Sequence, residues 1–142
     1  MANTRPVRAR DDASNALIKL HRGGKAEGDL VEVDPLQMKI AVLTEALGSK
    51  ARAAEFLGVA RSQPGKWLAG KERPNPRARR LIQDFEYVWD RLTGDRAPEV
   101  AHVWLRSANG HLNGATPLAW LRMRGPDGLI AAIDAEEAGS YA

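Results

Sequence analysis

Residues 49–74 have the sequence SKARAAEFLGVARSQPGKWLAGKERP, and their spacing predicts a helix-turn-helix. The small side chain of Ala54 lets a partner helix cross closely, and Gly58, four residues later, supplies the positive φ that the turn needs. Val59 and Trp67 then supply apolar contacts between the two helices. The motif is typical of proteins that bind DNA in the major groove.

The second helix of this motif and the residues around it carry the groups expected to contact DNA. Arginine and glutamine side chains pair bidentately with guanine and adenine edges, which discriminates by about 1–3 kcal/mol for each base. Basic side chains at the margins are expected to contact phosphates. The predicted DNA-binding residues are Lys50, Arg61, Ser62, Gln63, Lys66, Lys71 and Arg73.

Pro64 and Gly65 depart from the usual composition of such a helix. Proline fits if Ser62 or Gln63 is the cap, so that Pro64 lies in the first turn. Gly65 weakens the helix by roughly 0.5–1 kcal/mol relative to alanine. We therefore expect a short recognition helix whose specificity depends on its first residues.

A homodimer is expected, because one short recognition helix contacts too few base pairs for useful affinity. The candidate interface is the long helix predicted over residues 76–92, which carries Phe85, Tyr87 and Trp89. The alternative, in which all three aromatic side chains pack inside the monomer, stays open at this point.

Caps and apolar stripes predict an all-α fold. Aspartate, serine, asparagine or threonine precedes most of the apolar segments, proline often follows the cap, and glycine often ends the helix. No segment alternates with period two, so no sheet is expected. The expected helices cover residues 35–47, 50–57, 62–69, 76–92, 98–106, 117–124 and 128–138.

Charge and composition divide the chain into three regions: a flexible N-terminal arm (1–34), the helix-turn-helix domain (35–92) and a C-terminal domain (93–142). Residues 35–80 hold ten basic and three acidic residues, whereas residues 81–142 hold five basic and nine acidic ones. The basic region suits phosphate binding, and the acidic region suits another partner. The chain has no cysteine, no apolar run near the ~20 residues of a membrane span and no signal peptide, so a cytoplasmic protein is expected.

Two parts of the chain resemble one family. Residues 35–92 look like an Xre-type helix-turn-helix, and residues 99–138 are similar to the toxin-binding domain of Xre/MbcA/ParS-type antitoxins. The second resemblance depends on Trp104-Leu105, Asn109, Leu112, Gly114, Pro117-Leu118 and the break at Gly125.

The resemblance implies a dimeric antitoxin encoded beside a RES-domain toxin that depletes NAD. The C-terminal domain would cover the active-site cleft of the toxin, and the helix-turn-helix would repress the shared operon. The tail would enter the cleft, with its terminal carboxylate in place of a phosphate. The implied toxin-binding residues are Trp104, Asn109, Leu112, Pro117, Leu118, Ser140, Tyr141 and Ala142.

Other candidate sites have weak support in the sequence. The three histidines have no ligand spacing, and the acidic cluster Asp134, Glu136 and Glu137 has no partner base, so neither a metal, a cofactor nor an enzyme is expected. Two alternatives remain: a dimeric repressor without a toxin, and an adaptor that has lost DNA binding. A neighbouring RES-domain gene would separate the antitoxin from both.

Overall fold

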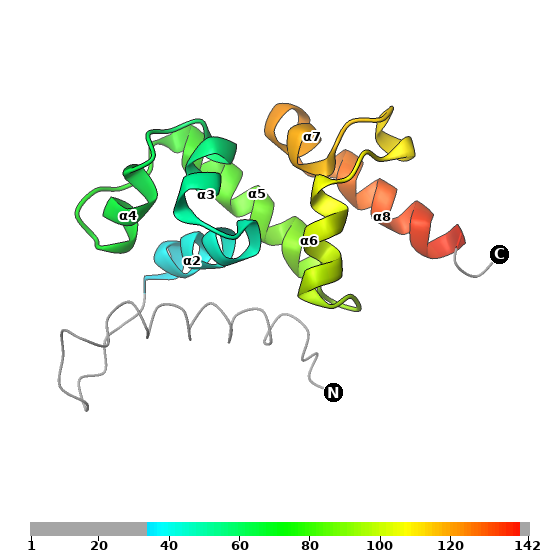
Figure 1. The fold of residues 1–142 in the computed structure, drawn as a ribbon, viewed down its shortest axis with the longest axis horizontal. Helices are drawn as coiled ribbons and strands as arrows, with labels where there is room; N and C mark the ends of the chain where they lie inside the picture. The colour runs from blue at the N-terminus through cyan, green and yellow to red at the C-terminus, as the bar shows by residue number, and fades with distance from the viewer. Residues whose placement is uncertain (1–33, 140–142) are drawn as a thin grey trace.

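The computed structural model describes residues 34–139, and within them the chain is entirely helical, as predicted. Most of the expected N-terminal arm, and Ser140, Tyr141 and Ala142 of the expected tail, lie outside the described residues. The helices, shown in Figure 1, are α2 (Pro35–Leu47), α3 (Lys50–Leu57), α4 (Gln63–Leu68), α5 (Pro76–Leu92), α6 (Pro98–Arg106), the 3-10 helix η2 (Gly110–Leu112), α7 (Pro117–Arg124) and α8 (Asp127–Gly139).

Side-chain caps begin four of the α-helices. Asp34, Ser49, Asn75 and Thr116 each accept a hydrogen bond from a backbone N–H two or three residues later, at 2.8–3.2 Å. Each cap satisfies one of the N–H groups that a helix start leaves without an intrahelical partner. These caps stand where the sequence predicts them, so the helix starts follow from local chemistry.

Helix α5 lies at the centre of one continuous hydrophobic core. Figure 1 shows it running through the middle of the molecule, with α2, α3 and α4 on one side and α6, α7 and α8 on the other. Phe85 contacts Phe56 of α3 edge-to-face and stacks on Trp89, with ring centroids 5.9 Å apart in both pairs. The core continues into the C-terminal helices through residues such as Leu121 and Ile133. Both halves of the chain therefore share this core.

Burial separates the three aromatic side chains of α5. Phe85 is 1% exposed and Trp89 is 7% exposed, whereas Tyr87 is 58% exposed. Phe85 and Trp89 therefore pack inside the monomer and cannot face a second copy. Of the proposed dimer contacts on α5, only Tyr87 remains at the surface.

The C-terminal end of α2 is capped by side chains of α6. His102 Nδ1 lies 2.5 Å from the Ala46 carbonyl oxygen, and Arg106 Nη2 donates to the Leu47 carbonyl oxygen at 2.7 Å. The last carbonyls of a helix have no intrahelical partner and carry partial negative charge, which a cationic donor stabilises. These contacts join the N-terminal and C-terminal halves directly.

Candidate nucleic-acid interface and partner surface

The turn between α3 and α4 has the backbone that its glycine predicts. Gly58 has φ 70° and ψ 35°, in the left-handed region that glycine reaches without steric cost. Its N–H donates to the Glu55 carbonyl at 3.2 Å, and the Val59 N–H donates to the Ala54 carbonyl at 3.0 Å. This pair of bonds is a Schellman motif, which ends α3 and turns the chain toward α4.

Helix α4 is short and is anchored by its C-terminal half. Pro64 lies in its first turn, where the missing N–H removes no intrahelical bond. Ser62 stands at the cap position, although its side chain makes no capping bond. Trp67 is 2% exposed, and Gln37 Nε2 of α2 donates to its carbonyl oxygen at 3.2 Å. The core therefore holds a helix that its composition alone would leave marginal.

The predicted base-contacting residues lie at and near the N-terminal end of α4. Arg61 and Ser62 are exposed, whereas Gln63 and Lys66 are half-buried. Lys66 Nζ lies 3.7 Å from a carboxylate oxygen of Glu72, and both of these side chains remain accessible to solvent. Arg61 and Ser62 are therefore the freest of the four to approach a base edge.

The predicted phosphate-contacting residues surround this helix. A Cβ placed on Gly65 of α4 would lie 3.9 Å from Lys50 Nζ, so Lys50 of α3 lies against α4. Lys71 and Arg73 follow α4 in the chain and are exposed. Arg73 Nη2 lies 3.7 Å from Asp34 Oδ2 across an open surface, where such a pair contributes little to stability.

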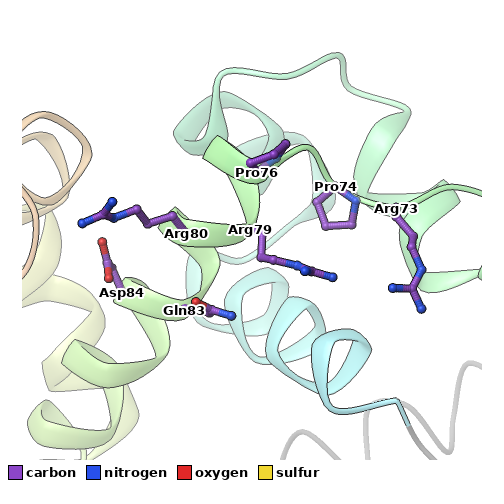
Figure 2. Close-up of a pocket in the computed structure, with 7 residues that line it drawn as sticks. All are labelled: Arg73, Pro74, Pro76, Arg79, Arg80, Gln83 and Asp84. Carbon is purple, nitrogen blue, oxygen red and sulfur yellow. The ribbon is translucent and has the colours of Figure 1, made fainter.

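A groove of about 490 Å³ continues the basic surface onto the start of α5. Figure 2 shows Arg73 and Arg79 on one side of it, with Arg80 reaching toward Asp84 on the other. Arg79 and Arg80 were not among the predicted DNA-binding residues. The groove is lined by Arg73, Pro74, Pro76, Arg79, Arg80, Gln83 and Asp84.

The sequence carries a signal for this groove in residues 76–80, PRARR. Helix α5 has no acidic residue in its first turn, and three arginines lie within its first five residues. The positive end of a helix dipole disfavours cations by some tenths of a kcal/mol, roughly 0.3–1 each. Arg77 donates to the Leu57 carbonyl oxygen at 3.3 Å and so caps the end of α3, whereas Arg79 and Arg80 line the groove.

Asp84 is the acidic group in this groove. Burial raises the pKa of its carboxyl group, the nearby Arg80 lowers it, and Asp127 of α8 raises it again. The net effect is a pKa above the ordinary value. The groove is dominated by arginines because three of them line it against this one carboxylate.

In the C-terminal half, Glu136 of α8 joins two of the predicted toxin-binding residues. Its carboxylate accepts hydrogen bonds from Trp104 Nε1 at 2.9 and 3.1 Å and from Asn109 Nδ2 at 3.0 Å. Asn109 Oδ1 in turn accepts the His111 N–H at 2.8 Å, and Asn109 is only 7% exposed. Asn109 therefore fixes the loop between α6 and α7 and offers little surface to a partner.

Two further predicted contact residues lie in the interior. Leu112 is 1% exposed within the core cluster, and Pro117 is buried at the first position of α7. Neither is placed to contact a toxin directly, because both side chains are covered by their own chain. Leu118 is half-buried and lies in a groove between α3 and α7.

The exposed large apolar side chains of this half are Val100 and Val103 on α6 and Met123 on α7. Val100 is 56% exposed and Val103 is 62% exposed, although helix packing would normally favour burying them. The half-buried Trp104 extends this strip into a hollow of about 370 Å³ beside His111 and Glu136. The sequence predicts that these valines lie on a helix. It does not show which face of that helix the rest of the chain leaves uncovered.

Ion pairs fix α8 against α5. Arg91 Nη2 lies 2.6 Å from Asp134 Oδ1 and 2.9 Å from Glu137 Oε1, and Arg96 Nη1 lies 3.5 Å from Glu137 Oε2. The hydrogen bond from Arg91 lowers the pKa of Glu137, and the same bond raises the pKa of Arg91. The acidic cluster of α8 is therefore largely engaged in structure.

The comparisons with known proteins gave no relatives: no family model, curated protein or solved structure matches this chain. Within residues 34–139, no three histidine, aspartate or glutamate side chains gather as metal ligands would. In the same residues, every helix is too short or too polar to cross a bilayer. Its function is therefore inferred from the geometry of the chain itself.

Proposed function

We propose that this chain is a DNA-binding protein, not an enzyme, and that it represses transcription from a double-stranded operator. One observation carries the proposal: exposed Arg61 and Ser62 immediately precede a short helix that Trp67 anchors, and the basic side chains of Lys50 and Arg73 flank it. Base-reading groups at the start of a helix with cations around it are the arrangement that major-groove binding uses. The protein would act in the cytoplasm.

The repressor would bind as a homodimer. Helix α4 has six residues, so one copy contacts few base pairs. Two copies whose recognition helices lie one turn of DNA apart, about 34 Å, give a palindromic site with useful affinity. Tyr87, exposed on α5, is the aromatic residue available for the contact between copies.

The C-terminal half would bind a RES-domain toxin and cover its active-site cleft, which would make the protein an antitoxin. The exposed strip of Val100 and Val103, next to the Trp104 hollow, is the surface that supports this role. Asn109 and Leu112 would support that surface from inside. The tail, Ser140 to Ala142, stays a proposed contact outside the described residues.

Operator binding is tested with duplexes from the region upstream of the gene, by fluorescence anisotropy at moderate salt. Replacing Arg61, Gln63 and Lys66 together with alanine should abolish preference for the operator over random DNA. Arg124→Ala is the matched control, because that arginine lies over the Trp120 ring in α7. Operator binding that survives the triple change would show that α4 is not the recognition helix.

Toxin binding is tested separately by NAD depletion in the presence of the neighbouring RES-domain protein. Val103→Asp should abolish neutralisation and leave operator binding intact, because the side chain is exposed and its replacement should not affect folding. Met123→Asp, at another highly exposed apolar residue, is the control. If the Val103 variant still neutralises, α6 is not the contact surface; if a truncation after Ala138 still neutralises, the tail is not required.

A further inference from the structure

A second basic groove lies between the two halves of the molecule, apart from the proposed DNA surface. It has a volume of about 370 Å³ and lies between α3 and α7. Three arginines from three different helices line it, together with one carboxylate. The lining comprises Leu47, Arg52, Glu55, Phe56, Arg106, Thr116, Leu118, Ala119 and Arg122.

Two of the guanidinium groups lie near the C-terminal end of α2. Arg106 Nη2 donates to the Leu47 carbonyl oxygen at 2.7 Å. Arg52 Nη1 lies 3.4 Å from the position that a Cβ would take on Gly48, the next residue. A guanidinium has five N–H donors, so the contact to Leu47 fixes Arg106 and leaves most of its donors available.

The third guanidinium lies toward the other end of α3. Arg122 Nη2 is 3.1 Å from the position of a Cβ on Gly58, the glycine that ends this helix. Helix α3 has eight residues and is therefore about 12 Å long. The groove thus presents cations along the length of one short helix, which suits an elongated anion.

These three arginines have no carboxylate within salt-bridge distance in the described part of the chain. Arg91 and Arg96, by contrast, are paired with carboxylates of α8. Like charges gathered on one surface repel each other unless an anion lies between them. With Glu55 counted, the groove has a formal balance of +2.

We propose that this groove binds a phosphate-bearing anion. A phosphate dianion matches the charge of the groove, and its oxygens match the planar fork of arginine donors. A chain of two or more phosphates would reach both the pair at Leu47 and Arg122. The phosphates come either from a small phosphorylated molecule or from a nucleic-acid backbone.

The test is a titration of the full chain with pyrophosphate, followed by amide and arginine Nε shifts in NMR spectra. Saturable shifts should gather at Gly48, Gly58 and the three arginines. Arg106→Gln should weaken binding at least fivefold. Arg124→Gln, two residues from Arg122 but stacked on Trp120, should leave it unchanged.

Glu55→Gln provides a second variant that does not disturb the cap on α2. It removes the carboxylate from the groove, so pyrophosphate should bind several-fold more tightly. Shifts that do not saturate, equal effects of the Arg106 and Arg124 variants, or no gain from Glu55→Gln would overturn the proposal. A glutamate-rich peptide that binds as tightly as pyrophosphate would also overturn it.

Competition with random duplex DNA then identifies the source of the phosphate. Displacement of pyrophosphate by DNA indicates a nucleic-acid backbone, and its absence indicates a small phosphorylated molecule. Both results retain phosphate as the bound group. The proposal is independent of operator recognition, which the α4 variants test on a different surface.

Discussion

Replacing Glu136 with alanine is expected to destabilise the C-terminal half of the protein. Its carboxylate is the acceptor for Trp104 Nε1 of α6 and for Asn109 Nδ2 of the following loop. These hydrogen bonds span 32 and 27 residues of sequence, so they fix tertiary structure and not a single helix. The substitution removes the acceptor and leaves both donors in place.

The expected cost follows from the burial of each donor. Asn109 is 7% exposed, so water replaces its lost acceptor less readily than that of Trp104, and an unsatisfied buried donor costs about 1–3 kcal/mol. Trp104 is only half-buried, so water can replace most of its lost bond. We expect a loss of about 2 kcal/mol in the free energy of unfolding, which for a folding unit of this size lowers Tm by about 7–9 °C.

Urea unfolding followed by circular dichroism measures this loss. Glu136→Gln retains one acceptor oxygen but turns an N–H₂ group toward the second donor, so it should cost about half as much. Glu45→Gln, at an exposed residue of α2, is the control and should change the stability by less than about 0.5 kcal/mol. A Glu136→Ala variant within that same limit, at an unchanged m-value, would refute the assigned role.

Three further outcomes are expected. Arg79→Ala should reduce the slope of log K against log salt by about 0.9 for operator and random DNA alike, and an unchanged slope excludes a phosphate contact. The pKa of Glu137 is lowered chiefly by its hydrogen bond from Arg91, so the stability it contributes is present above its ordinary pKa of 4.5 and lost as the pH falls through the lowered value. In the Glu137→Gln variant, the free energy of unfolding should therefore fall less steeply as the pH is lowered. An unchanged fall at acidic pH would contradict this assignment. Gly58→Ala should cost about 1 kcal/mol in chemical denaturation because of its positive φ, whereas Gly110→Ala should cost much less; equal costs would exclude backbone strain at the turn.

The helix boundaries could be predicted because their causes are local. Each of Asp34, Asn75 and Thr116 precedes a proline and accepts a hydrogen bond from a backbone N–H within the next three residues. Four or five consecutive residues are therefore enough to specify each helix start. Gly48 and Gly58 have positive φ at the ends of α2 and α3. Neither the caps at the helix starts nor the glycines at the helix ends depend on residues far away in the sequence.

The faces of the helices could not be predicted in the same way. Helical geometry places Tyr87 opposite Phe85 and Trp89, but it does not say which face the C-terminal helices cover. The structural role of Asn109 could not be predicted either, because its hydrogen-bond partner Glu136 lies 27 residues away in the sequence. Leu112 resembled a contact residue by position in its motif, although its side chain fills the core. Tertiary packing decides all three.

The shared core bears on how the proposed functions are divided. A boundary after residue 92 separates the basic half from the acidic one, yet Phe85 belongs to a core that both halves complete. The carbonyls of Ala46 and Leu47 at the end of α2 are contacted by His102 and Arg106 of α6, so the N-terminal half depends on the C-terminal half for these two contacts. A fragment that ends at residue 92 would expose part of its core and lose both contacts. The two proposed functions therefore occupy different surfaces of one folding unit, and α6 connects the partner surface to the helix that packs against α4.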